Sequence, residues 1–260
     1  MRRILITGAT GQIGTELTRE LRSRYGANNV IASSRHCPRD DAEHRWAPFE
    51  EMDVTDRESI RRVIETHDVD TVFHLAAVLS AVGEQDPQRA WHVNVNGLHN
   101  VLEAARTCEV KQVFWPSSIA AFGPNTPRVH TPQDTITHPT TMYGVTKVAG
   151  ELLCDYYVDH YGLDVRGVRY LGVISSDTPP GGGTTDYAVE IFYAAVKEGR
   201  YTCFVTEETV LPMIYMPDCI RAAIGLMNAD RSGLRHYNGF NIAAMSFSAG
   251  ELAAVPLCAR

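Results

Sequence analysis

The alternation of short apolar runs with amphipathic segments over the first 170 residues most constrains the fold of this chain. Short runs rich in Ile, Val and Phe are typical of buried strands, and apolar residues recurring every three or four positions are typical of helices. The predicted strands lie at 4–6, 29–33, 49–54, 71–75, 112–115 and 165–170. The predicted helices between them carry Ile13, Leu17 and Leu21, or lie at 56–66, 87–108 and 140–161. This order predicts an α/β fold, a doubly wound parallel sheet with helices on both faces.

The alternation loosens after Leu171, where a polar, glycine-rich loop at 175–183 precedes helices predicted at 186–197 and 217–227. We therefore expect a larger domain over 1–172 and a smaller C-terminal lobe over 173–260. The lobe should lie at the carboxyl edge of the strands, where open α/β sheets bind ligands. Because the chain closes soon after the predicted start of a last helix, we expect this lobe to be shortened.

Composition excludes several classes of protein. The 260 residues are 44% apolar, which is too high for disorder, yet no apolar run approaches the ~18 residues of a membrane helix. A strand-like run begins at residue 2, so we expect no signal peptide. The formal charge of −7 disfavours a nucleic acid partner. The ten histidines lack metal-binding spacing, so no metal is expected. Six scattered cysteines fit reduced thiols in a cytoplasmic protein; they are Cys37, Cys108, Cys154, Cys203, Cys219 and Cys258.

Three glycines directly follow the first predicted strand, at Gly8, Gly11 and Gly14. In such a turn the first glycine permits a tight bend, the second admits a pyrophosphate, and the third allows close packing of helix on strand. The following helix start supplies free N–H groups to phosphates. Glycines at this spacing also occur as simple turn residues, but the position between strand and helix favours a Rossmann dinucleotide site. The residues expected to hold the dinucleotide here are Gly8, Gly11, Gln12, Ile13 and Gly14.

The choice between NAD and NADP depends on the end of the second strand. An acidic residue that would bond the ribose 2′-hydroxyl is missing there, because Ser34 is followed by Arg35. Serine and arginine would tolerate a 2′-phosphate, so NADP stays possible, although Arg35 could simply point into solvent. Further residues expected beside the cofactor are Asp53 and Val54 near the adenine, and Leu75, Ala76 and Ala77 after the fourth strand.

Tyr143 and Lys147 are four residues apart at the start of a predicted helix, so they share a face. A tyrosine is a poor base at neutral pH, and a nearby cation would favour the phenolate. Such a pair is common by chance on helix surfaces. Ser118, at the end of the fifth strand, supports the catalytic interpretation because its hydroxyl could hold the substrate oxygen that Tyr143 deprotonates.

These motifs, with His74 and Asn94, resemble those of the extended short-chain dehydrogenase/reductases, which include nucleotide-sugar epimerases and dehydratases. Longer stretches at 116–124, 181–187 and 237–247 resemble the short-chain L-threonine 3-dehydrogenases. The resemblance covers essentially the whole chain. It departs at Ser34, where these enzymes usually carry aspartate, and at the C-terminal segment that usually follows.

The resemblance implies oxidation of the L-threonine 3-hydroxyl by NAD, giving 2-amino-3-ketobutyrate. Tyr143 would be the general base, Lys147 would lower its pKa and bind the nicotinamide ribose, and Ser118 would orient the alcohol. The resemblance also places Asn94 and Tyr170 beside the cofactor. The implied substrate residues are Ser80, Thr184, Thr185 and Asp186, although Asp186 could instead cap a helix. The two long predicted helices would pair with their copies in a homodimer, which could compensate for the shortened lobe.

Two other functions stay open at this point. A nucleotide-sugar epimerase or dehydratase would retain its NAD and need a large pocket with basic residues for a second diphosphate. A non-catalytic dinucleotide sensor would need no Ser118, Tyr143 and Lys147 set.

Overall fold

The computed structural model describes residues 1–38, 46–179, 181–242 and 244–255. Pro180, Ala243 and residues 256–260, with Cys258, were part of the sequence predictions and lie outside the described residues. The central sheet has six parallel strands in the order β3-β2-β1-β4-β5-β7. This order confirms the doubly wound Rossmann fold, whose crevice lies where the strand order reverses, between β1 and β4. The strands of this sheet are β1 (Ile4–Thr7), β2 (Val30–Ser34), β3 (Phe49–Glu51), β4 (Thr71–His74), β5 (Gln112–Phe114) and β7 (Asp164–Arg166).

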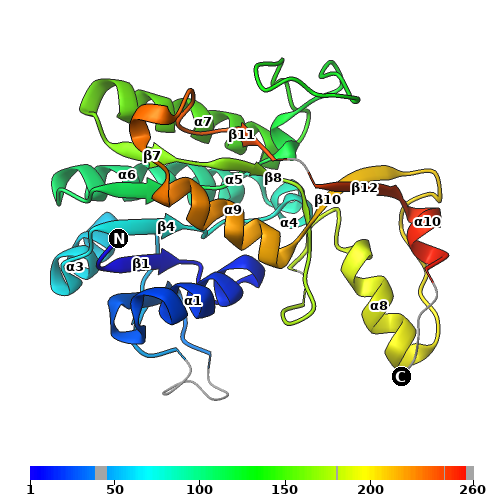
Figure 1. The fold of residues 1–260 in the computed structure, drawn as a ribbon, viewed down its shortest axis with the longest axis horizontal. Coiled ribbons are helices and arrows are strands. Elements are labelled where there is room, and N and C mark those ends of the chain that lie inside the picture. The colour runs from blue at the N-terminus through cyan, green and yellow to red at the C-terminus, as the bar shows by residue number, and fades with distance from the viewer. Residues whose placement is uncertain (39–45, 180, 243, 256–260) are drawn as a thin grey trace.

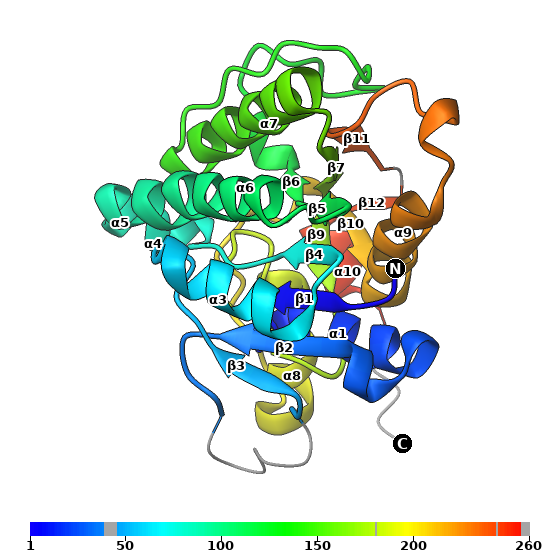
Figure 2. The same cartoon turned by 90° about the vertical axis from the view of Figure 1, so that its left-hand side faces the viewer.

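Helices cover both faces of this sheet (Figure 1). One face is packed by α1 (Gln12–Tyr25) and α9 (Met216–Asn228), whose apolar side chains meet Ile4, Ile6 and Phe114. The other face is packed by α3 (Arg57–His67), α6 (Gly97–Thr107) and α7 (Met142–Tyr161). Figure 2 shows α3, α6 and α7 stacked along that face. The buried strands are apolar on both sides because each must contact a helix layer.

Local signals set several helix ends. The side chain of Asp56 accepts hydrogen bonds from the backbone N–H groups of Glu58 and Ser59 and so caps the N-terminus of α3. Thr141 caps α7 in the same way by accepting from Gly144. α7 ends at Gly162, whose φ of 67° suits glycine.

The helix expected over 87–108 is confirmed as one continuous helical run, in which α5 (Pro87–Trp91) continues through a π-helical turn, His92–Asn96, into α6. One predicted element is wrong as a single piece. The strand expected over 165–170 is split at Gly167 into β7 and β8 (Val168–Tyr170). A Cβ at Gly167 would lie 2.1 Å from the carbonyl oxygen of Trp115, so this position brings two backbones together where the sheets part.

The second part of the chain has a small core of its own, formed by Tyr187, Ala188, Met213, Ala249 and Leu252. Figure 1 shows its α8, β12 and α10 together at one end of the molecule. The same part also returns to the first domain, because α9 packs on the central sheet and β11 pairs with β8. The boundary at residue 172 therefore stays a prediction. The lobe elements are β9 (Gly172–Ile174), α8 (Tyr187–Glu198), β10 (Val210–Tyr215), β12 (Met245–Ser248) and α10 (Ala249–Ala253).

A second sheet, in the order β12-β10-β9, lies in the lobe, and a third sheet joins the end of the fifth strand to the C-terminal part in the order β11-β8-β6. The described cysteines are all free thiols. Within the described ranges, no helix is long and apolar enough to cross a membrane. The remaining elements are β6 (Ser117–Ser118), β11 (Phe240–Asn241), α4 (Ser80–Gln85) and the short 3-10 turns Ala27–Asn29, Ile119–Ala121 and Arg231–Gly233.

Candidate active site

A cavity of about 490 Å³ opens at the carboxyl ends of the parallel strands, between the central sheet and the lobe. This is the place where the reversal of strand order predicts ligand binding. It brings together most of the residues that the sequence assigned to cofactor and substrate. Those that line it are Gly8, Gly11, Gln12, Ile13, Gly14, Leu75, Ala77, Ser80, Ser118, Tyr143, Lys147, Tyr170, Thr184, Thr185 and Asp186.

The glycine turn is shaped by contacts too close for a side chain. Gly8 has a φ of 69°, and a Cβ there would lie 2.7 Å from the backbone nitrogen of Ala76. A Cβ at Gly14 would lie 2.2 Å from the carbonyl oxygen of Gly8. At Gly11 a Cβ would approach only that same oxygen, at 3.3 Å. Gly8 and Gly14 are therefore required by the fold, whereas Gly11 keeps the cavity wall open.

Six residues expected at the cofactor do not line the cavity. Val54 is buried in the hydrophobic core, and the Asn94 amide is occupied by the backbone of Val78 and the hydroxyl of Thr146. Both side chains stabilise the packing of α6 and α7, and a contact of either residue with the cofactor stays a prediction. The other four are Ser34, Arg35, Asp53 and Ala76.

Ser34 and Arg35 lie where β2 ends, beyond the glycine turn. The Ser34 hydroxyl accepts a hydrogen bond from Thr10 at 3.0 Å, and Arg35 is exposed. Partial burial acts to raise the pKa of Asp53, but hydrogen bonds from Thr55 and the positive charge of Arg35 lower it below its ordinary value. Arg35 and Asp53 are thus neighbours at the end of the crevice where the nucleotide would lie.

Tyr143, Lys147 and Ser118 meet at the other end of the cavity. Tyr143 and Lys147 lie one turn apart on α7, and Lys147 Nζ is 5.4 Å from the Tyr143 ring centroid. Burial raises the pKa of Tyr143 to about 12, and a hydrogen bond with Ser118 acts in the opposite direction. The Lys147 ammonium donates to the carbonyl oxygen of Pro116 at 2.6 Å, and its expected lowering of the Tyr143 pKa stays a prediction. Burial lowers the pKa of Lys147 to about 8.

His74 is a buried residue of β4 whose ring is hydrogen-bonded within the core. Its Nδ1 is 2.7 Å from the Thr7 hydroxyl oxygen, and burial lowers its pKa to about 3, with the charge of Lys147 contributing. Tyr170 reaches the cavity wall but donates its hydroxyl hydrogen to the carbonyl oxygen of Cys219. The His74 ring and the Tyr170 hydroxyl therefore both have hydrogen-bond partners within the protein.

The Thr-Thr-Asp triplet forms the opposite wall, at the end of the glycine-rich loop. Oδ2 of Asp186 accepts hydrogen bonds from the backbone N–H groups of Gly182 at 2.8 Å and Gly183 at 2.7 Å. The carboxylate thus ties the loop together and makes no side-chain cap to α8. Burial raises its pKa above the ordinary value, against these two hydrogen bonds. Asp186 therefore occupies the N-cap position of α8 without a side-chain capping hydrogen bond, and its contact with a substrate stays a prediction.

Sequence reasoning missed part of the lining. Gly172 packs against the lobe so closely that a Cβ would lie 2.8 Å from Cβ of Thr185. Leu171 and Val173 flank it, and all three follow the strand predicted to end at 170. Residues directly after a parallel strand face the ligand edge, so strand position alone could have indicated them.

The model of the NAD dependent epimerase/dehydratase family matches residues 4–243, which is most of the chain. The chain belongs to this family. An uncharacterized epimerase/dehydratase of Staphylococcus haemolyticus is 52% identical over 98% of this chain and 80% of its own length.

Two solved structures of the same fold are similar to this family member. The holo form of a GalE-like L-threonine dehydrogenase from Cupriavidus necator is 52% identical, with a TM-score of 0.93, covering 97% of this chain and 81% of its own. The apo form of a monomeric L-threonine 3-dehydrogenase from a metagenome is 48% identical, with a TM-score of 0.92, covering 96% and 80%.

The glycine turn fits the nicotinamide dinucleotide that membership of the family implies. The first turn of α1 contains no acidic residue, and among the described residues no side chain caps its N-terminus at Gly11. Its N–H groups and the positive end of its dipole therefore suit a diphosphate. Gln12 of this turn donates to Ser175 at 3.0 Å and so joins the turn to the segment after β9.

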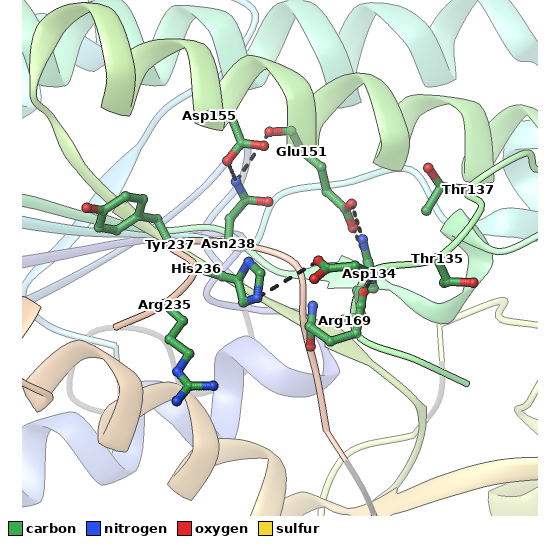
Figure 3. A pocket seen from close by; sticks show the side chains of 11 residues that line it. Asp134, Thr135, Thr137, Glu151, Asp155, Arg169, Arg235, His236, Tyr237 and Asn238 are labelled. Carbon is green, nitrogen blue, oxygen red and sulfur yellow. Dashed lines mark hydrogen bonds and ion pairs between the residues drawn. The ribbon is translucent and has the colours of Figure 1, made fainter. Parts of the chain in front are cut away.

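A second cavity, of about 390 Å³, is lined in part by Glu151 and Asp155 of α7 and is mostly polar (Figure 3). Figure 3 shows the ion pair of Glu151 with Arg169 in its wall, and the hydrogen bond between Asp155 and Asn238 beside it. Within the part of the chain that the structure describes, no group of three or more His, Cys, Asp or Glu side chains could hold a metal ion.

Proposed function

We propose that this protein oxidises L-threonine at its 3-hydroxyl and transfers the hydride to NAD, giving 2-amino-3-ketobutyrate. The observation that carries the proposal is that Ser118, Tyr143 and Lys147 meet in one cavity with the glycine turn and face a Thr-Thr-Asp loop. The similarity to L-threonine dehydrogenases at about half of all positions supports it.

In this reaction, residues of the chain would accept the proton of the substrate hydroxyl. The Ser118 hydroxyl would hold the substrate oxygen, and the Tyr143 oxygen would accept the hydroxyl proton. The raised pKa of Tyr143 means that its proton must be displaced before each turnover. When bound, the oxidised nicotinamide supplies the hydride acceptor and a positive charge that favours the phenolate. Lys147 would add a second positive charge on the same side of the ring.

The lobe would recognise the amino acid. An ammonium group needs an anionic partner and a carboxylate needs hydroxyl or N–H donors, and Asp186 beside Thr184 and Thr185 offers both. Ser80, the first residue of α4, lines the same cavity and would contact the substrate. These roles rest on the lining of the cavity and on the resemblance of the triplet to the enzyme family.

The test is direct. Purified protein is mixed with L-threonine and either NAD or NADP, and the absorbance of the reduced cofactor is followed. We expect reduction with L-threonine and none with D-threonine, whose mirror-related groups cannot meet the same side chains. If neither cofactor is reduced, the proposed reaction is wrong.

The nucleotide-sugar alternative predicts a different result in the same preparation. An epimerase retains its dinucleotide, so the purified protein would carry tightly bound cofactor and would convert UDP-glucose without net reduction. The small Thr-Thr-Asp wall favours an amino acid over a sugar nucleotide. Wild-type turnover of L-threonine would also exclude a non-catalytic sensor.

We also propose a homodimer in the cytoplasm. Leu152 is 66% exposed and Tyr156 is 45% exposed on one side of α7, and Trp91 of the adjacent α5 is 41% exposed. An apolar face of this kind favours pairing with a second copy. One similar enzyme is described as monomeric, so the solution mass decides. Sedimentation equilibrium should give twice the chain mass, and Leu152→Asp should give the monomer; a monomeric wild type would contradict the proposal.

A further inference from the structure

Glu151 is a buried carboxylate on α7, one helical turn beyond Lys147 and two beyond Tyr143, so the three share a helix face. Its Oε1 accepts a hydrogen bond from the Ser117 hydroxyl at 2.5 Å and one from Nε of Arg169 at 2.8 Å. Its Oε2 accepts from Nη2 of Arg169 at 2.7 Å. The two-pronged ion pair is visible in Figure 3. Such charge-assisted pairs fix geometry in both distance and orientation.

β6, the strand that is hydrogen-bonded to Glu151, also carries Ser118, whose hydroxyl would orient the substrate. Ser117 and Ser118 make up β6, and successive side chains of a strand point to opposite faces. Ser117 is turned to Glu151, whereas Ser118 faces Tyr143. β6 pairs with β8 so that Ser117 lies opposite Arg169. Glu151 is therefore bonded to both strands behind the reacting groups.

We propose that Glu151 is a positioning residue, which fixes Ser118 relative to Tyr143 through Ser117 and Arg169 and sets its negative charge behind the Lys147 ammonium. The proposal rests on the proposed function, because Ser118 and Tyr143 must act on one substrate oxygen. A displacement of reacting groups by about 1 Å costs on the order of 10²-fold in rate.

The effect of Glu151 on Lys147 depends on the other titratable groups that surround the Lys147 ammonium. The titratable groups that face the ammonium are the phenol of Tyr143, the carboxylate of Glu151 and the thiol of Cys154 on α7, and the imidazole of His74 on β4. Burial keeps the phenol and the thiol protonated and the imidazole neutral at neutral pH. Glu151 is the member of this set that forms an ion pair, with Arg169. Burial lowers the pKa of Lys147, and Cys154 and Glu151 oppose that shift.

A matched pair of variants separates positioning from stability. Glu151→Gln keeps the shape and removes the charge. Asp164→Asn does the same to the buried pair of Asp164 and Arg166, which has the same two-pronged geometry at 2.8 Å but lies on β7, outside both cavities. Both variants leave a buried arginine without its carboxylate, so both should lower the melting temperature.

The expected results differ in catalysis. Glu151→Gln should lower kcat for L-threonine by about 10²-fold, with little change in KM or in the Kd of the dinucleotide. It should also move the alkaline limb of the kcat–pH profile to lower pH, because Lys147 loses its proton more easily. Asp164→Asn should keep the wild-type kcat and profile, and Glu151→Asp should restore the position of the alkaline limb. Equal behaviour of Glu151→Gln and Asp164→Asn in kcat and profile would overturn the proposal.

Ser117→Ala tests the link if Glu151→Gln does not fold. It removes only the hydroxyl contact and leaves the ion pair intact, so kcat should fall about tenfold, the effect of one good hydrogen bond, with the melting temperature lowered by only a few degrees. A wild-type kcat in this variant would overturn the positioning role.

An activity-independent measurement separates this proposal from the proposed function. Lys111, Lys147 and Lys197 are the only lysines of the chain, so side-chain NMR titration can assign Lys147 by its loss in Lys147→Arg. We expect a lower pKa for Lys147 in Glu151→Gln than in the wild type. This shift would support the electrostatic role even if L-threonine were not the substrate, and its absence would overturn that role even in an active enzyme.

Discussion

The two walls of the main cavity are built in different ways. The sheet wall consists of the glycine turn at 8–14, the ends of β4 and β6, and the first turns of α7; the lobe wall consists of residues 181–186 and Leu211. In the sheet wall, backbones approach more closely than any side chain would allow, as at Gly8 and Gly14. In the lobe wall, Gly181, Gly182 and Thr184 are exposed, and the loop is tied by the hydrogen bonds of one carboxylate, Asp186.

This difference assigns different tasks to the walls. Groups set by packed backbone hold their geometry before a ligand arrives, which suits the cofactor and the reacting atoms. A loop with few contacts adjusts at low cost, which suits a small substrate. Changes in the sheet wall should therefore act on kcat or on cofactor affinity, and changes in the lobe wall on KM.

The largest effect is expected at Tyr143. Tyr143→Phe removes the proton acceptor and keeps the ring, so kcat should fall by about 10²–10⁴-fold while the dinucleotide Kd stays the same. The control is Tyr156→Phe, on the exposed side of the same helix, which should keep full activity. In the wild type, kcat should rise with pH as the phenolate population of Tyr143 grows, up to the alkaline limb at which Lys147 loses its proton. Full turnover by Tyr143→Phe would show that Tyr143 is not the general base.

The second effect tests the rigidity of the sheet wall. Gly14→Ala places a Cβ 2.2 Å from the Gly8 carbonyl oxygen and 2.8 Å from Cα of Ala9, so the turn must move. Overpacking of this kind costs about 1–3 kcal/mol, and we expect the dinucleotide Kd to rise about tenfold or more. Gly225→Ala, where a Cβ meets nothing within 4 Å on α9, should leave both Kd and activity unchanged. Calorimetric titration with NAD measures the Kd of each variant, and equal affinities for Gly14→Ala and the wild type would show that the turn can shift to accept a side chain.

The third effect tests the lobe wall. Asp186→Asn keeps an oxygen that can accept from Gly182 and Gly183 but removes the negative charge. Loss of a charged hydrogen bond to the ammonium, about 1.5–3 kcal/mol, should raise KM for L-threonine about tenfold or more with kcat largely kept. Asp186→Ala should lower the melting temperature as well, since the loop then loses its tie. An unchanged KM in Asp186→Asn would confine Asp186 to holding the loop.

The sequence was most informative where one local rule decides the structure. Strand–helix alternation predicted the doubly wound sheet, and Gly8 and Gly14 were identified because only glycine fits such contacts. It was less informative where the structure depends on a contact between segments that are distant in the sequence. The break at Gly167 depends on the backbone of Trp115, and the buried amide of Asn94 depends on Val78, neither of which periodicity can indicate. The roles of the individual site residues stay predictions.

The electrostatics could not be predicted from spacing. Tyr143 and Lys147 were correctly placed on one helix face, but their spacing does not show that Pro116 accepts from the ammonium or that burial raises the phenol pKa. Glu151 follows Lys147 at the same interval on α7, but its partner Arg169 lies on β8, which the helix spacing does not indicate. The sequence predicted which groups gather in the cavity, and tertiary packing decides how each is charged.

The smallest effect is expected where the sheet wall ends, at Ser34. A carboxylate there would bond the ribose 2′-hydroxyl of NAD and repel the 2′-phosphate of NADP. Ser34→Asp should therefore weaken NADP binding by about tenfold or more, since like charges at contact cost several kcal/mol, and change NAD affinity only a few-fold. Arg35→Ala, which removes the exposed cation, should also weaken NADP binding without affecting NAD.

Ser34→Asp and Arg35→Ala test whether the fixed geometry of the sheet wall extends to its end at residues 34 and 35. Ser34 is tied to the turn by Thr10, whereas Arg35 is exposed, so the first should act through fixed geometry and the second through charge alone. Added salt should reduce the effect of Arg35→Ala on NADP affinity, because exposed charges are screened over about 10 Å at 0.1 M, and should leave more of the Ser34→Asp effect. Equal NADP affinities for the wild type and both variants would show that neither residue meets the 2′ position.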